Sequence, residues 1–163
     1  MYDHGMSGCN YISLAPYYPQ NAFPQALQLI AESAGSERED ELFYESLLSM
    51  APGPQDMEII SSIRDDERKH NRIFRQLYCE LTGREVPPAN GEGFEPPASY
   101  CQGIGRALFG ELAAVERYRM ILFGLSTCQP YANAVTEIYT DELKHSVKWN
   151  YLYCINGCCA QAR

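Results

Sequence analysis

The chain has 163 residues, of which 45% are hydrophobic, and this length suits one domain with a sizeable core. Its 21 acidic residues against 13 Lys and Arg give a formal net charge of −8, which argues against a nucleic-acid partner or an anionic membrane surface. No apolar run approaches the roughly 20 residues of a membrane span, and the N-terminus lacks the features of a signal peptide. We therefore expect a cytoplasmic protein without a membrane anchor.

Seven cysteines are many for this length, but their number is odd and no signal peptide accompanies them. A reduced state fits these facts better than a disulfide scaffold. Cys154, Cys158 and Cys159 could bind a soft metal or undergo redox exchange, or they are incidental thiols of a frayed terminus. No Cys-x-x-Cys pair supports a rubredoxin-like iron site or a zinc ribbon.

Residues 1–23 are rich in Tyr, Pro, Asn and Gly and show no helical period. We expect them to form an irregular arm over the outside of the domain, with His4 as a surface or disordered residue. A bundle domain is expected over residues 24–157, and a short cysteine-containing tail over residues 158–163.

Four heptad stripes of apolar residues follow the arm, and each predicts a long helix. These helices are expected from Pro24 to the break at residues 51–54, from about Gln55 to Leu81, from about Ser99 to Thr127, and after Gln129-Pro130 to about Gly157. Residues 84–98 are rich in Pro and Gly, so they are expected to form a long connection between two helical hairpins. The sequence thus predicts an all-α four-helix bundle.

Polar residues occupy the inward stripes at mid-helix, where Leu or Ile would ordinarily lie. They are Glu37, Glu67, His70, Glu111, Glu142 and His145. Four bare carboxylates in a bundle core would repel one another and lose their hydration. Two divalent cations carry four positive charges and would balance the four glutamates, so this pattern predicts a dinuclear metal site.

The ligand pattern occurs twice along the chain. Glu37 precedes Tyr44 by seven residues, and the same pair recurs 74 residues later as Glu111 and Tyr118. Likewise, Asp66-Glu67-x-x-His70 recurs 75 residues later as Asp141-Glu142-x-x-His145. Because Glu at i and His at i+3 share a helix face, the two hairpins are expected to be related by pseudo-two-fold symmetry.

These motifs resemble those of the rubrerythrin branch of the ferritin-like superfamily, and the resemblance covers about residues 25–155. It implies a left-handed bundle, with Glu37 and Glu111 as terminal ligands, Glu67 and Glu142 bridging the metals, and one His at each metal. Two features depart from the family. Rubrerythrins carry an additional carboxylate three positions after the third-helix ligand, where this chain has Ala114. They also usually carry a rubredoxin-like domain, which this sequence is expected to lack.

Glu41 lies on the inward stripe of the first helix and is a candidate for the missing carboxylate. The alternative is an ion pair with Arg38, Arg64 or another base. By analogy with di-iron oxygenases, Asp66 is expected to accept a hydrogen bond from His145, and Asp141 from His70. Two solvated helix acids are the alternative for this pair.

Tyr44 and Tyr118 are candidates, with Glu67 and Glu142, for the catalytic residues. The tyrosines could donate hydrogen bonds to ligand carboxylates or carry tyrosyl radicals, and ordinary core tyrosines are the favoured interpretation. Core packing near the site is expected for Phe74 and Trp149. A solvated face is expected for Arg64, Arg68, Lys69 and Lys144.

A site of oxygen and nitrogen ligands favours two iron ions, with manganese as an alternative and zinc as a substitute. The leading hypothesis is a protein that reduces peroxide or O₂, or oxidises Fe(II), with an unidentified electron donor. The alternatives are a non-catalytic iron-handling or structural protein and a substrate oxygenase. Family analogy indicates a homodimer.

Overall fold

The computed structural model describes residues 21–88 and 95–161, and within these ranges it contains helices and no strand. The helices are α1 (Ala22–Leu48), α2 (Pro54–Thr82), α3 (Tyr100–Gly124), α4 (Gln129–Ile155) and the short α5 (Cys158–Gln161). The predicted all-α class and the four long helices are therefore confirmed. Over the same ranges, no helix is both long and apolar enough to cross a membrane.

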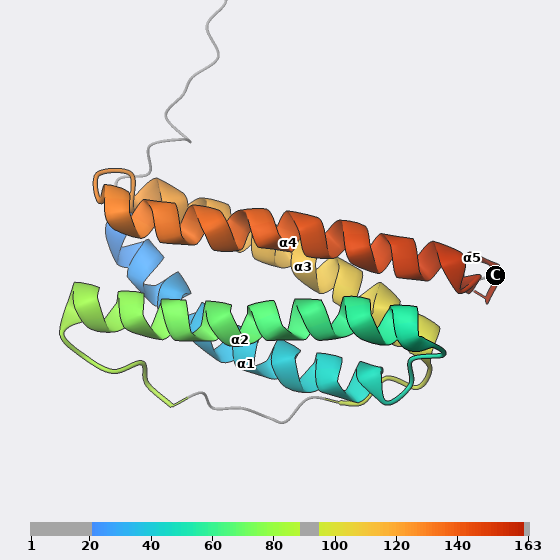
Figure 1. Cartoon of the computed structure of the whole chain (residues 1–163). Coiled ribbons are helices and arrows are strands. Elements are labelled where there is room, and N and C mark those ends of the chain that lie inside the picture. The colour runs from blue at the N-terminus through green and yellow to red at the C-terminus, as the bar shows by residue number, and fades with distance from the viewer. Residues whose placement is uncertain (1–20, 89–94, 162–163) are drawn as a thin grey trace, which may run out of the picture.

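The four long helices pack as two hairpins. α1 pairs with α2, α3 pairs with α4, and the hairpins meet chiefly where α1 lies along α3 (Figure 1). α2 ends at one end of the bundle and α3 begins at the other, as a long connection between two hairpins requires (Figure 1). The expected arm, including His4, lies almost entirely outside the described residues, and α1 begins at Ala22, two residues before Pro24.

Local signals set several helix ends. Pro54 occupies the first turn of α2, where its missing N–H costs nothing. Gly83 ends that helix at φ 68, a left-handed conformation that glycine adopts without a steric penalty. Ser99 caps α3 by accepting a 3.2 Å hydrogen bond from the backbone N–H of Gln102.

Two apolar clusters fill the bundle on either side of a polar middle. One cluster contains Ile30 and Phe74, and the other contains Leu47 and Trp149; all four side chains are fully buried. The polar residues at mid-helix lie between these clusters, where apolar packing keeps water away and makes unpaired charge expensive.

The cysteines depart from the expected reduced state, because Cys101 and Cys158 form a disulfide across 57 residues of sequence. Gly157, at φ 66, turns the chain after α4, and Cys158 then packs in the same apolar cluster as Trp149. A soft-metal site that uses all three C-terminal thiols is therefore wrong, since the sulfur of Cys158 is already bonded. Cys154 and Cys159 are free and exposed, and the expected frayed tail is replaced by α5 up to Gln161.

Candidate metal centre

Six side chains from four helices converge in the middle of the bundle. They are Glu37 of α1, Glu67 and His70 of α2, Glu111 of α3, and Glu142 and His145 of α4. None of them is more than 3% exposed. Charged groups rarely stay so deeply buried unless they are paired or bind metals.

The six residues form two overlapping groups, each bringing four ligand atoms within 4.8 Å of one another. One group consists of Glu37, Glu67, His70 and Glu142, and the other of Glu67, Glu111, Glu142 and His145. Each group has its own histidine and its own terminal glutamate, whereas Glu67 and Glu142 belong to both. This arrangement can hold two metal ions that share two carboxylates.

Each histidine presents Nδ1 to the centre of the cluster. Nδ1 of His70 lies 3.0 Å from Glu142, 3.3 Å from Glu67 and 3.6 Å from Glu37. Nδ1 of His145 has matching carboxylates at 3.2, 3.5 and 3.7 Å, from Glu67, Glu142 and Glu111 respectively. The point between each nitrogen and its three oxygens is therefore surrounded by potential ligands.

The opposite nitrogen of each ring meets an aspartate from the other hairpin. Nε2 of His70 lies 3.3 Å from Oδ2 of Asp141, and Nε2 of His145 lies 3.0 Å from Oδ2 of Asp66. These are the two pairs expected from the sequence. A proton held on Nε2 by the aspartate leaves the Nδ1 lone pair available to a metal.

Several buried polar atoms of the cluster have no hydrogen-bond partner. Across the described residues, the buried side-chain N and O atoms without such a partner belong to Ser33, Glu37, Glu67, Glu142 and His145. Four of these five residues are in the cluster. Because an unsatisfied buried polar group is costly, these atoms fit a site built to coordinate metal ions.

Protons neutralise the cluster when metals do not. Burial opposes the charged form of His70, but the nearby carboxylates of Glu142 and Glu37 outweigh it and raise its pKa to about 10. The carboxylates of Glu111 and Glu142 near Nδ1 of His145 likewise outweigh burial and raise the pKa of His145 to about 10. Both imidazoles are thus cationic at neutral pH in the metal-free protein.

The four glutamates divide into two classes. Burial, together with the charges of neighbouring carboxylates, raises the pKa of the two shared residues, Glu67 and Glu142, well above the usual range. Burial acts in the same direction on Glu37 and Glu111, but hydrogen bonds from neighbours including the histidines and tyrosines lower their pKa values. The two shared glutamates are therefore harder to ionise than the two terminal ones.

Aromatic donors fix the two terminal glutamates. The hydroxyl of Tyr44 donates a 2.7 Å hydrogen bond to Glu111, and the hydroxyl of Tyr118 donates one to Glu37. Burial, followed by the charge of the bonded glutamate, raises both tyrosine pKa values, so the hydroxyls keep their protons. Of the roles considered for these tyrosines from the sequence, the hydrogen bonds to carboxylates of the cluster are present.

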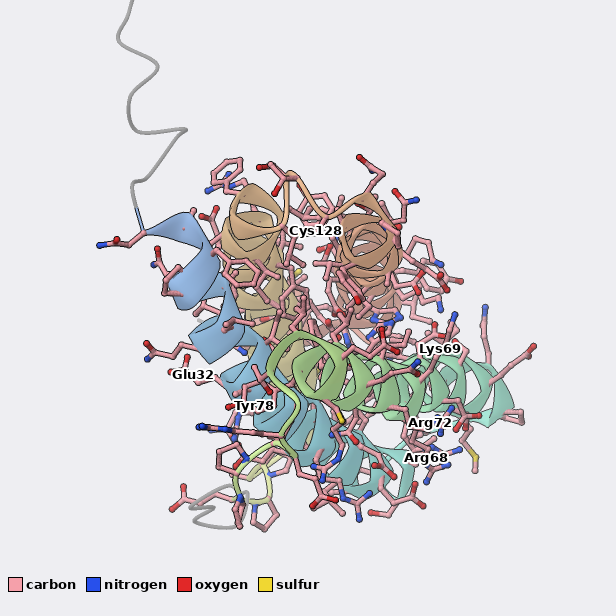
Figure 2. All side chains as sticks on the ribbon, turned by 90° about the vertical axis from the view of Figure 1, so that its left-hand side faces the viewer. Glu32, Arg68, Lys69, Arg72, Tyr78 and Cys128 are labelled. Carbon is pink, nitrogen blue, oxygen red and sulfur yellow. A yellow bond between two sulfur atoms is a disulfide. The ribbon has the colours of Figure 1, made fainter. Side chains whose placement is uncertain are left out.

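Glu41 belongs to neither ligand group. Its carboxylate accepts a hydrogen bond from Arg38 and another, of 2.6 Å, from Arg68 of α2. The ion pair considered from the sequence is thus the arrangement that the structure contains. Arg68, Lys69 and Arg72 extend outward from α2 (Figure 2), and Lys69 is paired with Glu137 of α4.

Two residues beside the cluster, Trp149 and Asp40, were not predicted from the sequence to interact with its polar groups. Trp149, expected to fill the core, also donates its indole N–H to Glu111 at 2.8 Å. Asp40 is half-buried, and burial followed by the charges of Glu37 and Glu111 raises its pKa well above the usual range. The position of Asp40, one helical turn after Glu37 and one turn before Tyr44, was the signal in the sequence that it lies beside the cluster.

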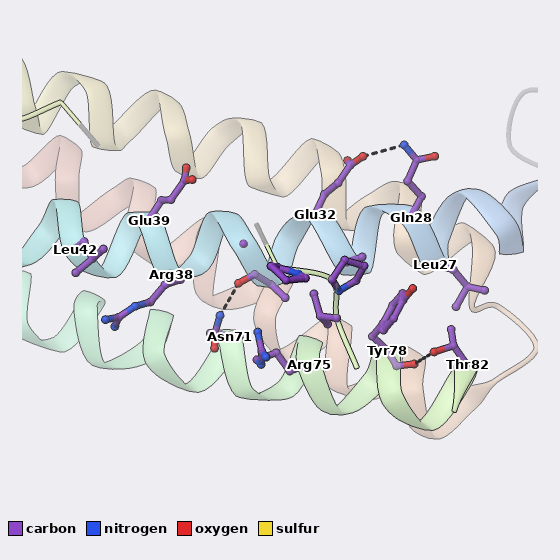
Figure 3. Close-up of a pocket in the computed structure, with 16 residues that line it drawn as sticks. Leu27, Gln28, Glu32, Arg38, Glu39, Leu42, Asn71, Arg75, Tyr78 and Thr82 are labelled. Atoms are coloured by element: carbon purple, nitrogen blue, oxygen red, sulfur yellow. Dashed lines mark hydrogen bonds between the residues drawn. The ribbon is translucent and has the colours of Figure 1, made fainter. Parts of the chain in front are cut away.

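A groove of about 990 Å³ lies outside the cluster, between α1, α2 and the first residues of the connection (Figure 3). Leu27, Tyr78 and Val86 form part of its apolar lining, and Arg38 and Arg75 lie on its wall. None of the six cluster residues lines this groove. An organic molecule bound there would be separated from the cluster, which gives the oxygenase alternative no support.

The chain is similar to a protein of Bacillus subtilis (strain 168) described as uncharacterized protein YhjR, with 26% identity over 140 residues. The matched region covers 85% of this chain and 94% of the relative. No family model matches the chain, and no solved structure matches it. The relative's description names no function, so the functional argument rests on the geometry of the cluster.

Proposed function

We propose that this chain is a dinuclear iron carboxylate protein of the rubrerythrin-like branch of the ferritin-like superfamily, with the left-handed bundle of that family. The observation that carries the proposal is the pair of overlapping ligand groups that share Glu67 and Glu142. The repeated Glu, Tyr and Asp-Glu-x-x-His motifs support it, since they supply the matching side chains of both groups.

In this proposal, Glu37 and His70 would hold one metal ion and Glu111 and His145 would hold the other, and both ions would share Glu67 and Glu142. When bound, two Fe(II) ions supply the two electrons that, with two protons, convert peroxide to two water molecules. The same two electrons, with two protons, would reduce O₂ to hydrogen peroxide. In the alternative reaction, the substrate Fe(II) would be the electron donor, and O₂ or peroxide would accept its electrons. Iron is preferred over manganese for this redox chemistry, and zinc would fill the site without redox activity.

The chain's own residues position the ligands and exclude water. Asp66 and Asp141 hold a proton on Nε2 of each histidine, so Nδ1 remains a lone-pair donor. Tyr44 and Tyr118 hold one oxygen of Glu111 and of Glu37. The apolar clusters on either side keep the site dry, which strengthens every electrostatic interaction within it.

The assembly, the electron donor and the compartment are further parts of the proposal. A homodimer is supported by large apolar side chains that remain exposed on α3 and α4, among them Phe109 at 70% and Val147 at 68%. A separate protein would supply electrons. A cytoplasmic location completes the proposal. The Cys101–Cys158 disulfide would be an exception in that compartment, because disulfides in reducing compartments are usually transient.

Metal analysis of protein purified anaerobically from its own host tests the proposal. We expect about two iron ions per chain, and growth of an oxo-bridge band in the near ultraviolet after peroxide is added. Loss of both iron ions in the Glu67→Ala, Glu142→Ala double variant is expected, whereas Glu58→Ala, at an exposed position of α2, retains them. Metal-free wild-type protein, or a metal load unchanged in the double variant, would overturn the proposal.

A further inference from the structure

One difference between the two halves of the cluster lies in a pair of aromatic residues. The repeat that relates Glu67 to Glu142 also relates Phe74 to Trp149, because both pairs are separated by 75 residues. Both aromatic side chains are fully buried. Each packs on the tyrosine that donates to the terminal glutamate of the same ligand group. The ring centroids are 5.0 Å apart for Phe74 and Tyr118, on the side of Glu37, and 4.9 Å apart for Trp149 and Tyr44, on the side of Glu111.

The two aromatic rings therefore occupy matching positions in the two halves, but they differ in hydrogen-bonding chemistry. The indole of Trp149 carries an N–H group that donates to Oε1 of Glu111, whereas a phenyl ring has no donor. Oε1 of Glu111 also accepts the hydroxyl hydrogen of Tyr44. The matching oxygen of Glu37 accepts a hydrogen bond from Tyr118 and has no indole partner.

The other oxygen of each terminal glutamate faces the cluster. Oε2 of Glu111 lies 3.7 Å from Nδ1 of His145, and Oε2 of Glu37 lies 3.6 Å from Nδ1 of His70. Each glutamate thus offers one oxygen to its metal position while the other is held by donors. Glu111 is held by two donors and Glu37 by one.

An additional donor weakens a carboxylate as a metal ligand. Hydrogen bonds to an ionised carboxylate stabilise its negative charge, and a cation that binds the same carboxylate competes for that charge. The hydrogen bond consequently weakens when the metal binds, so part of its stabilisation is lost. Asp40 is a second difference between the halves, because the repeat relates it to Ala114. Replacing Trp149 alone isolates the indole, since Asp40 then stays in place.

We propose that the two metal positions are inequivalent: the indole N–H of Trp149 lowers the metal affinity of the Glu111–His145 position, so the Glu37–His70 position fills first. The ion beside Glu111 is then the one that exchanges when metal is scarce. This inference rests on the proposed dinuclear site, and Trp149 acts on it as a positioning residue through Glu111.

Anaerobic titration with Mn(II) tests the inference, with heat and the electron paramagnetic resonance signal of free Mn(II) as readouts. We expect two binding steps in the wild type, with dissociation constants about tenfold apart, which corresponds to roughly 1.4 kcal/mol. Trp149→Phe copies the residue of the other half and is expected to tighten the weaker step about fivefold. The tighter step is expected to change less than twofold.

Single-position variants assign the effect to one half. His70→Ala leaves the Glu111–His145 position, and Trp149→Phe is expected to tighten Mn(II) binding in that background. His145→Ala leaves the other position, where Trp149→Phe is expected to have no effect. An equal change in both backgrounds would mean that Trp149 acts only through packing, and it would overturn the inference.

Tyr118→Phe leaves Trp149 unchanged and is expected to change the ratio of the two dissociation constants in the opposite direction. It removes the hydroxyl donor of Glu37, so it is expected to tighten the stronger step and to widen the gap between the two constants. Two equal constants in the wild type, or a narrowed gap in Tyr118→Phe, would contradict the inference while leaving the dinuclear site intact. Absence of any Mn(II) binding in the wild type would instead contradict the proposed function.

Discussion

His145 is held between the two hairpins, with Nε2 3.0 Å from Oδ2 of Asp66 on α2 and Nδ1 facing the carboxylates of the cluster. His70 has the equivalent arrangement, with its Nε2 facing Oδ2 of Asp141 on α4. Each aspartate therefore orients a histidine contributed by the opposite helix. In this way a tertiary contact between α2 and α4 sets which imidazole nitrogen is available to a metal.

Removing an orienting aspartate charge is expected to weaken metal binding. Asp66→Asn leaves the shape of the side chain but no longer favours the proton on Nε2 of His145, and losses of about 10-fold or more in metal affinity are typical for such changes. Equilibrium dialysis against Mn(II) measures the effect. Asp65→Asn, an exposed neighbour, is the control; equal affinities in the two variants would contradict the orienting role.

Metal loading is expected to release protons. Both histidines have a pKa of about 10 without metal and must be neutral to coordinate, so loading at pH 7 releases two protons from them. The raised pKa values of Glu67 and Glu142 act in the same direction, because ligating carboxylates must also be ionised. A pH indicator in weakly buffered solution counts the protons, and metal affinity is expected to rise with pH. Release of no protons would contradict the described protonation pattern.

The stability of the metal-free protein is expected to fall as pH rises. The histidine pKa is raised from 6.5 to about 10 on folding, so its stabilising contribution is complete below pH 6.5 and is lost as pH rises through 10. Denaturant titrations at pH 7 and pH 10 measure the change. The metal-loaded protein is expected to change less, because its histidines are already neutral.

Metal binding is expected to stabilise the fold. A ligand at 100 times its dissociation constant adds about 2.7 kcal/mol for each occupied position, and the cluster offers two positions. Chemical denaturation with and without Mn(II) measures the gain. The Glu67→Ala, Glu142→Ala variant is the control, and a gain of equal size in that variant would place the metal outside the cluster.

The Cys101–Cys158 disulfide is expected to stabilise the end of the bundle. It closes a loop of 57 residues, and the chain-entropy relation gives about 4 kcal/mol for a loop of that length. Cys101→Ser is expected to lose this contribution, whereas Cys154→Ser, which removes an exposed free thiol, is expected to keep it. Mass spectrometry of the alkylated protein should find Cys101 and Cys158 in one linked peptide.

Much of the fold followed from the sequence, because helical periodicity and helix-end residues are local properties. Pro54, Gly83 and the Pro- and Gly-rich connection placed the helices to within a few residues. Glu37, Glu111 and the two Asp-Glu-x-x-His motifs lay on apolar stripes, so their burial together was predictable. The pairs Asp66–His145 and Asp141–His70 followed from analogy with di-iron oxygenases.

Other features depend on contacts between residues far apart in the chain, and only the tertiary structure decided them. Cys158 reaches Cys101 because the chain turns at Gly157, and nothing in the cysteine spacing indicates that pairing. Glu41 faces Arg68 because of the way α1 packs on α2. The indole of Trp149 points at Glu111 because α4 packs beside α3. The sequence by itself thus determined which residues form the cluster, whereas helix packing decided which hydrogen-bond partners surround them.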